Sequence, residues 1–399
     1  MIETCLILNR WTDDFARYER IIDHNRIAVA YLTVREHAAG LPAGLAHRVE
    51  VIDRPGDRQA VFGAAQRCVD TLGRLDRIIA LSEFDLILAA ELRERFGVAG
   101  HHVVDVLRFR DKLAMKQAVA DAGLAVPLAA DLDDGVAVAR VVAAVGFPLI
   151  VKPRQGAASQ GCLRVDDRNG LEREIGWRQG QGHEVEQFVA GPILHVDGLV
   201  ANGSPSFMWV WRYVNTCYDF ANGLPLGSVM VPVADAVPSM EFTRRVLRAL
   251  DLVCGAFHLE IIEGPTGLCF LEIGARVGGG EIPFVVRDVF GVDLVGDWLR
   301  MEIGEKAETV HSVQAASAEL GGFLMVPEPV GYRLAAFEDP MGRVDGLYAA
   351  AIPPLGHRFD GTGGYETILG RFRFRGDTPA KITNAVQDTL ECFRYQLEK

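Results

Sequence analysis

Four short apolar runs open the sequence, and stretches with helical spacing follow them. The runs occupy residues 5–8, 27–32, 49–52 and 78–81. Short, branched runs bounded by polar residues are typical of buried strands. Residues 57–73 and 85–97 carry apolar side chains on one helical face instead. This alternation of strands and helices predicts a parallel sheet covered by helices over residues 1–108.

The turn after the first run argues against a dinucleotide-binding domain. Residues 9–14 have the sequence NRWTDD, which contains no glycine. A dinucleotide-binding fold needs glycine at this turn so that the backbone can approach the pyrophosphate. The sequence therefore disfavours a dehydrogenase.

The composition limits the function classes. The 399 residues include 41 basic and 53 acidic side chains, for a net charge of −12, and an acidic surface repels nucleic-acid backbones. No run reaches the roughly 18 apolar residues of a membrane span, and the first residues do not resemble a signal peptide. The seven cysteines include no C-x-x-C pair, which favours free thiols in a cytoplasmic protein over disulfides or zinc. We expect neither nucleic acid nor a membrane as a partner.

The middle of the chain contains a hairpin with a loop of small residues. One helix is expected to open near Lys112 and to end before Pro127, and a second covers residues 133–145. Strands are expected over residues 149–152 and 162–165. The loop between them has the sequence PRQGAASQG, so the tip of this hairpin is expected to expose backbone N–H groups.

Strands dominate from residue 184 onward. The C-terminal helix is expected to start with Thr378 as its cap and Pro379 as its first residue. A further helix is expected over residues 239–250. The expected strands cover residues 184–189, 194–201, 207–213, 256–263 and 268–274.

Two glutamates near residue 270 give the strongest chemical signal. Glu272 ends an apolar strand, Arg276 follows four residues later, and three consecutive glycines come next. A hairpin about residues 264–267 would place Glu260 opposite Leu271 or Glu272. Two neighbouring buried carboxylates repel each other, and a hard cation such as Mg²⁺ would relieve that repulsion. The alternative is a pair of strand-end glutamates that face solvent.

The order of five motifs resembles that of the ATP-grasp superfamily, over about residues 105–300. The motifs are Arg-Asp-Lys at 110–112, Leu-Ile-Val-Lys-Pro at 149–153 with its loop, Val-Glu-Gln-Phe-Val at 185–189 with Gly191, Glu260, and Glu-Ile-Gly-Ala-Arg at 272–276. The resemblance implies an α/β and α+β, ATP-grasp fold. Its parts would be an N-terminal Rossmann-like parallel domain (1–108), a small central lid subdomain (109–185) and a larger mixed C-terminal domain (186–399).

The resemblance assigns two of the six lysines to the phosphates of ATP. Those lysines are Lys112 and Lys152, and a compact ammonium suits a phosphate that changes shape during transfer. Lys116, one helical turn beyond Lys112, is expected to be a solvated helix residue. The loop over residues 155–161 would cover the β- and γ-phosphates. Its expected contributors are Gly156, Ser159 and Gly161.

The remaining roles implied by the resemblance concern adenine, ribose, metal and catalysis. The Gln187 carbonyl and the Val189 N–H would hold adenine in a hinge that includes Glu186. Members of the superfamily commonly have a ribose-binding glutamate after the hinge glycine, but this chain lacks it, so ribose is assigned to Glu186, His195 or another group. The metal ligands would be Glu260 and Glu272, for Mg²⁺ or alternatively Mn²⁺. The catalytic residues would be Arg276 and Lys152.

Three other features of the sequence leave alternatives open. Gly274 stands where the superfamily usually has a metal-binding Asn, so a second metal ion is in doubt. Trp209, Trp211, Arg212 and Tyr213 could line a pocket, but a stripe of aromatic residues is more often part of the core, and the core is favoured. Glu83 ends a strand at the edge where α/β folds bind ligands, yet an ordinary acid at a helix start is the favoured interpretation.

The activity that the resemblance implies is ATP-dependent joining of a carboxylate to an amine. The carboxylate, an amino acid or similar acid, would form an acyl phosphate, and the amine would then displace phosphate. The expected partners are these small molecules, and a homodimer is left open. Alternative functions are a carboxylate–thiol ligase, a carboxylation like that of biotin carboxylase, or an ATP-binding protein without catalysis.

Overall fold

The N-terminal part of the chain forms the predicted parallel sheet. The computed structural model describes residues 3–11, 13–305, 319–361 and 368–399. The elements of this part are β1 (Glu3–Leu8), α1 (Asp13–Ala16), α2 (Tyr18–Ile21), β2 (Ile27–Val34), α3 (Arg35–Ala38), β3 (Arg48–Ile52), α4 (Arg58–Leu72), β4 (Arg77–Ala80), the 3-10 turn η1 (Glu83–Asp85), α5 (Leu86–Phe96) and α6 (Val103–Leu107). The strands pair in parallel in the order β3-β2-β1-β4. On one face Leu6 and Ala30 pack against Ala64 of α4 and Ala89 of α5.

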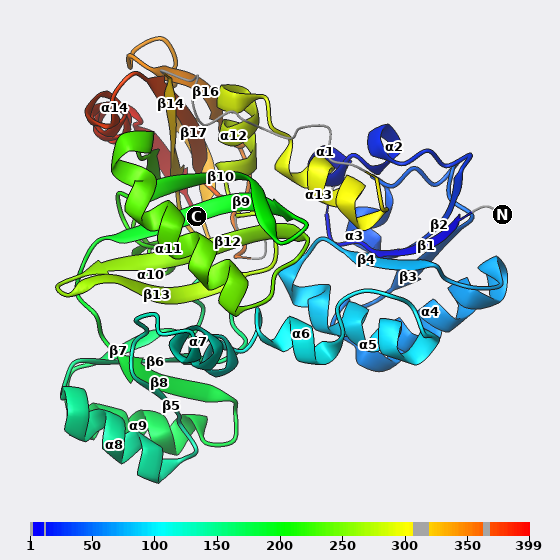
Figure 1. Cartoon of the computed structure of the whole chain (residues 1–399). Coiled ribbons are helices and arrows are strands. Elements are labelled where there is room, and N and C mark those ends of the chain that lie inside the picture. The colour runs from blue at the N-terminus through cyan, green and yellow to red at the C-terminus, as the bar shows by residue number, and fades with distance from the viewer. Residues whose placement is uncertain (1–2, 12, 306–318, 362–367) are drawn as a thin grey trace.

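A smaller antiparallel sheet follows, and its two faces differ in chemistry. Its elements are α7 (Lys112–Asp121), β5 (Ala129–Asp131), α8 (Gly135–Val145), β6 (Leu149–Pro153), β7 (Leu163–Val165), α9 (Arg168–Arg178) and β8 (His183–Gln187), with strand order β5-β8-β6-β7. Val151 and Val185 face a core formed with α8 and α9. Because side chains alternate along a strand, Lys152, Glu184 and Glu186 face the opposite side, where α7 lies (Figure 1).

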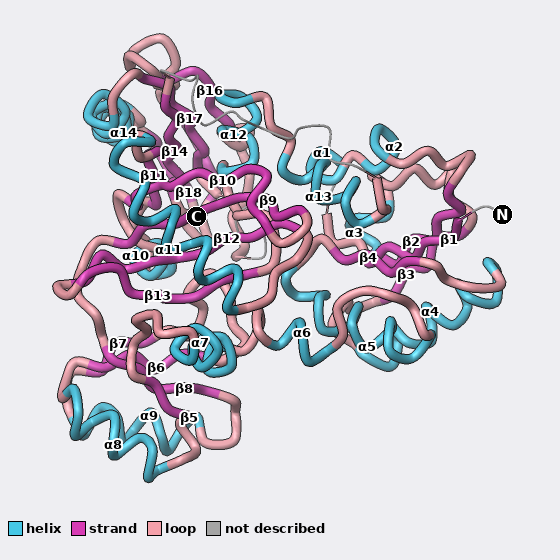
Figure 2. Tube along the Cα trace, viewed as in Figure 1, coloured by secondary structure: helices cyan, strands magenta, loops and turns pink. Residues whose placement is uncertain are grey.

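The rest of the chain forms an eight-stranded antiparallel sheet. The strand order is β13-β12-β9-β10-β11-β14-β17-β16. The elements are β9 (Ile193–Ala201), β10 (Ser204–Tyr213), α10 (Cys217–Ala221), β11 (Leu226–Met230), α11 (Val233–Ala249), β12 (Gly255–Gly264), β13 (Gly267–Gly274), α12 (Ile282–Phe290), α13 (Leu294–Glu302), β14 (Leu320–Val326), β16 (Leu347–Ala351), β17 (Gly370–Gly376) and α14 (Pro379–Cys392), beside a two-stranded sheet of β15 (Arg333–Phe337) and β18 (Tyr395–Glu398). Figure 2 shows the large sheet beside the smaller one.

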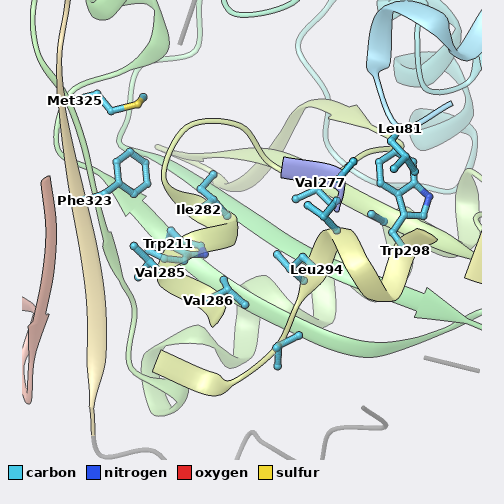
Figure 3. Close-up of a cluster of buried hydrophobic side chains, with 14 of the residues drawn as sticks. Leu81, Trp211, Val277, Ile282, Val285, Val286, Leu294, Trp298, Phe323 and Met325 are labelled. Atoms are coloured by element: carbon cyan, nitrogen blue, oxygen red, sulfur yellow. The ribbon is translucent and has the colours of Figure 1, made fainter. Parts of the chain in front are cut away.

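Both faces of the large sheet are buried. On one face, Met240 of α11 and Val119 of α7 join a cluster with Leu259 and Phe270 of the sheet. On the other face, α12 and α13 pack on Trp211 and Phe323, and the same cluster continues to Leu81 beside the N-terminal sheet (Figure 3). The N-terminal part and the large sheet therefore share one apolar core. Trp209 and Trp211 belong to this core, as the favoured interpretation predicted.

Several predicted elements are confirmed. The strand–loop–strand motif is the antiparallel pair β6–β7, with Leu149 opposite Val165, and Thr378 caps α14 through its side chain. The strands at 226–230, 320–326 and 370–376 were not predicted from the sequence. The proposed division into domains stays a prediction, and its boundary after residue 185 falls inside β8. No helix in the described part of the chain combines the length and the apolar character needed to cross a bilayer.

Candidate active site

The β12–β13 hairpin brings the two predicted metal ligands together. Glu260 is the direct cross-strand partner of Glu272, and a bulge follows between Glu260 and Ile261. Directly paired residues of an antiparallel ladder place their side chains on the same face. The hydroxyl of Tyr213 donates to Oε1 of Glu260 over 2.9 Å. The predicted register is confirmed. The carboxylate oxygens of Glu260 and Glu272 fit a hard cation such as Mg²⁺.

Lys112 links this hairpin to the smaller sheet. The Asp111 side chain caps α7 by accepting from the N–H groups of Leu113 and Ala114, which sets Lys112 at the first turn of the helix. Its Nζ lies 3.3 Å from Oε2 of Glu272. Burial opposes ionisation of Glu272, but Lys112, Lys152 and, more weakly, Lys116 outweigh it and lower the pKa of Glu272 to about 2. Glu272 is therefore ionised throughout the physiological range, as a metal ligand must be.

Lys152 lies on the side of the small sheet that faces α7. Its Nζ is 2.6 Å from Oε1 of Glu186 and 3.8 Å from Oε1 of Glu184. Burial alone would lower the pKa of Lys152, but Glu186 and Glu184 outweigh it and raise that pKa. The side chain thus stays an ammonium ion, in the state required to bind a phosphate.

Lys116 is not the solvated helix residue that the sequence predicted. Its side chain is 4% exposed, and its Nζ forms ion pairs with Glu184 and Glu186. The reason is the orientation of α7, whose buried side carries Lys112, Met115, Lys116 and Val119. Glu184 and Glu186 lie 68 and 70 positions away in the sequence, so helical spacing alone could not identify them as partners.

The loop with Gly156, Ser159 and Gly161 contacts Lys112. Lys112 Nζ donates to the carbonyl of Gly156 over 2.9 Å, and Arg110 donates to the carbonyl of Gln155 over 2.8 Å. Ser159 and Gly161 both adopt positive φ angles, 53° and 69°. The loop is thus held at its start by two cations from the beginning of α7 and the segment before it.

The predicted adenine hinge lies beside the tip of the β12–β13 hairpin. Gln187 ends β8, and its N–H donates to the carbonyl of Leu128 over 2.8 Å. A Cβ on Gly264 would meet Cγ1 of Val189 at 3.0 Å, and a Cβ on Gly191 would meet the carbonyl oxygen of Glu263 at 2.1 Å. The hinge and the β12–β13 hairpin are therefore in close contact.

His195 does not lie with the predicted nucleotide-binding residues. Its ring is fully buried in the large sheet, with Nδ1 2.6 Å from Asp197 and Nε2 2.7 Å from Ser228. Both ring nitrogens are thus engaged within the protein, and we no longer assign ribose to His195. The two oxygens of Glu186, the other candidate, are both in ion pairs with lysines.

A buried polar cluster of His195, Asp197 and His258 lies next to Glu260. Asp197 lies between His195 and His258, and Nδ1 of His258 is 2.8 Å from Asp197 while its Nε2 is 3.6 Å from Glu260. Burial alone would raise the pKa of Asp197, but the imidazoles of His258 and His195 outweigh it and hold that pKa well below its usual range. Asp197 and Glu260 likewise outweigh burial and raise the pKa of His258 to about 9. His258 is consequently an imidazolium at neutral pH, placed to orient Glu260.

Arg276 is held by a residue of the N-terminal part, Glu83. The Nε of Arg276 donates to Oε2 of Glu83 over 2.7 Å, and Arg110 pairs with the other oxygen of the same carboxylate. Burial opposes ionisation of Glu83, but Arg276 and Arg110 outweigh it and lower its pKa. Glu83 is thus a largely buried link, with its side chain 11% exposed, where the sequence favoured an ordinary helix-start acid. Its place at the end of a parallel strand was the available signal.

Gly274 leaves room for this ion pair. A Cβ at position 274 would meet Cγ of Arg276 at 3.3 Å and Oε2 of Glu83 at 3.6 Å. The space that an Asn side chain would enter is therefore occupied by Arg276 and Glu83. The glycine is consistent with a site that relies on Glu260 and Glu272 for its metal.

The chain is similar to known ligases. No protein-family model matches it. An L-arginine-specific L-amino acid ligase of Bacillus subtilis is 27% identical over 239 residues, covering 56% of each chain. A D-alanine–D-alanine ligase of Desulforudis audaxviator is 30% identical over 203 residues, covering 44% of this chain and 66% of that protein. The chain spans about half the length of the curated relatives it matches.

A solved structure covers the whole chain. The crystal structure of an L-amino acid ligase from Bacillus licheniformis has a TM-score of 0.78 at 15% identity, and the match covers 100% of this chain and 99% of that one. At this identity the likeness shows the fold. The predicted fold class is confirmed.

Proposed function

We propose that this chain, a member of the ATP-grasp superfamily, is an ATP-dependent ligase that joins a carboxylate to an amine and releases ADP and phosphate. One observation carries the proposal: Lys112 at the start of α7, Lys152 on the small sheet and the Glu260–Glu272 pair on the large sheet lie close together, and Arg276 follows Glu272 just beyond the end of β13. Cations that face paired carboxylates suit a polyphosphate bound with a metal ion. The names of the relatives favour amino acids as substrates.

The first chemical step would be phosphoryl transfer. A carboxylate oxygen of the substrate attacks the γ-phosphorus of ATP, the bond to the β,γ-bridging oxygen breaks, and ADP leaves. Lys112 and Lys152 offset the negative charge of the phosphates. A Mg²⁺ ion held by Glu260 and Glu272 would add further charge compensation when bound.

The second step would form the amide bond. The amine nitrogen attacks the carbonyl carbon of the acyl phosphate, phosphate leaves and the amine loses a proton. Arg276 would stabilise the departing phosphate or the oxyanion of the intermediate. In support of this role, it lies four residues after Glu272, just beyond the end of β13, and pairs with Glu83. The loop over Gly156 and Ser159 would exclude water, which hydrolyses acyl phosphates.

The test is turnover with a broad panel of amino acids and carboxylic acids in Mg²⁺-ATP. We expect ADP release that requires both a carboxylate and an amine, with an amide product visible by mass spectrometry. With ¹⁸O in the substrate carboxylate, one labelled oxygen should appear in the released phosphate, because the carboxylate oxygen bonds to phosphorus. Glu272→Gln should abolish turnover and leave the circular dichroism spectrum unchanged.

Three results would contradict the proposal. ADP release with bicarbonate and no amine would indicate carboxylation, and release that requires a thiol would indicate a thioester-forming ligase. Tight ATP binding without turnover on any substrate pair would indicate a binding protein.

A further inference from the structure

The predicted phosphate-binding lysine Lys152 belongs to a cluster of four buried charged side chains. Lys116 and Lys152 each form ion pairs with both Glu184 and Glu186. The four side chains are between 0% and 7% exposed. The proposed function gives Lys116 no role, so it does not account for the burial of Lys116 in this cluster.

The cluster is balanced only while Lys152 stays in it. Two ammonium ions face two carboxylates, and a buried carboxylate without a cation is strongly unfavourable. In the proposed function Lys152 must also bind a phosphate, which draws it away from Glu186, its partner at 2.6 Å. The departure of Lys152 would leave Glu184 and Glu186 with one cation between them.

Lys116 is that cation. Its Nζ lies 2.7 Å from Glu186, on the oxygen that Lys152 does not contact, and it also pairs with Glu184. Lys116 is one turn from Lys112 on the same face of α7, but Lys112 faces Glu272 whereas Lys116 faces β8. The two lysines therefore have separate partners, and Lys116 does not have to move when phosphates bind.

We propose that Lys116 is a positioning residue for nucleotide binding: it remains on Glu184 and Glu186 as their counter-ion and so allows Lys152 to exchange Glu186 for a phosphate. This inference rests on the proposed function, since it requires that Lys152 bind nucleotide. It predicts that the charge of Lys116, rather than its packing, sets the nucleotide affinity.

The test compares Mg²⁺-ADP binding by isothermal titration calorimetry across a set of variants of the full chain. Lys116→Met keeps the length of the side chain and removes its charge, so Mg²⁺-ADP should bind about 10-fold more weakly or worse. Adding Glu184→Gln to Lys116→Met removes one carboxylate and restores the net charge of the cluster, so most of the lost affinity should return. Lys381→Met, at a lysine that is 64% exposed, is the matched control and should bind as the unmodified chain does.

Each outcome decides between the ideas. If the unmodified chain does not bind Mg²⁺-ADP, both the proposed function and this inference fail. If it binds and Lys116→Met binds equally well, or if Glu184→Gln does not restore the affinity, the role of Lys116 is wrong while the proposed function stands. Should Lys116→Met not fold, Glu184→Gln alone decides, because fewer carboxylates compete for Lys152. It should then bind Mg²⁺-ADP at least as tightly as the unmodified chain, and a 10-fold loss would overturn the inference.

Discussion

At the scale of single residues, Glu83 connects the N-terminal part of the chain to two arginines from other parts of the chain. Its carboxylate pairs with Arg276 after β13 and with Arg110 before α7, and Arg110 in turn donates to the loop at Gln155. One side chain of the N-terminal part thus holds the proposed catalytic arginine, Arg276. It also holds Arg110, which contacts the loop predicted to cover the phosphates.

Glu83→Gln should therefore affect stability and catalysis together. We expect a loss of about 3 kcal/mol in the free energy of unfolding near neutral pH, because two arginines lose a buried partner. We also expect kcat to fall about 10-fold or more, because Arg276 loses the group that orients it. Urea unfolding and ADP release measure the two effects. Glu338→Gln, in an ion pair whose carboxylate is 59% exposed, is the control and should change neither by much.

The stability effect of Glu83→Gln has a defined pH dependence. The pKa of Glu83 in the folded chain lies below its ordinary value of 4.5. A depressed pKa stabilises the fold fully above that ordinary value, and the contribution fades as the pH falls through the folded pKa. The difference between the two chains should thus be largest near neutral pH and shrink below pH 4.5. A difference that grows in acid would contradict this assignment.

The sequence could identify most of the site residues but not their partners. The motifs that carry Lys112, Lys152 and the two glutamates are local, and the structure brings these four together. Lys116 and Glu83 were misjudged because their partners lie far away in the sequence, 68 residues for Glu184 and 193 for Arg276. His195 was misassigned because no local pattern reveals that a strand is buried on both faces.

At the scale of elements, the hinge and the β12–β13 hairpin are in close backbone contact. Gly191 follows β8 with a φ of +154°, and a Cβ there would lie 2.1 Å from the backbone oxygen of Glu263. The hairpin that carries Glu260 and the hinge proposed for adenine are thus packed backbone to backbone.

Gly191→Ala should separate these two elements. We expect a loss of about 2 kcal/mol or more, because neither backbone can move without breaking its pairing, and weaker Mg²⁺-ADP binding. Gly176→Ala is the control: this glycine lies in α9 with nothing within 4 Å of its Cβ position, so alanine should stabilise the chain by about 0.5–1 kcal/mol. Thermal unfolding of both variants checks the opposite signs. Equal tolerance of both substitutions would show that the hinge can yield.

The β12–β13 pairing could be predicted because its turn is short and fixes the register. The bulge after Glu260 could not be predicted, since no local pattern marks it. The strands β11, β14 and β17 were missed for another reason. The pairings of β14 with β11 and with β17 join segments that are distant in the sequence, and long-range pairing, rather than local propensity, makes such segments into strands.

At the scale of the whole molecule, one apolar core joins the N-terminal sheet to the large sheet. Leu81 and Val277 pack near Trp298 of α13 in this core (Figure 3). The smaller sheet has a separate core of its own with α8 and α9. A ligand that contacts both the small sheet and the large sheet should consequently stabilise the whole chain against unfolding.

Mg²⁺-ATP should raise the melting temperature. A ligand at about 100 times its Kd adds about 2.7 kcal/mol to the free energy of unfolding, and EDTA should remove most of this gain if Glu260 and Glu272 hold the metal. Differential scanning fluorimetry with ATP, with Mg²⁺-ATP and with EDTA measures the effect. Glu272→Gln should show a smaller shift with Mg²⁺-ATP, and an unchanged shift would contradict the metal site.

The link from Glu83 to Arg276 also limits how the chain could be recombined with its relatives. A chimera that exchanges residues 1–108 for those of another ligase would keep every proposed phosphate and metal contact, yet it would lose the partner of Arg276. Such a hybrid should function only if the donor supplies a carboxylate at the end of the corresponding strand. We therefore expect the N-terminal part and Arg276 to function together and not as exchangeable modules.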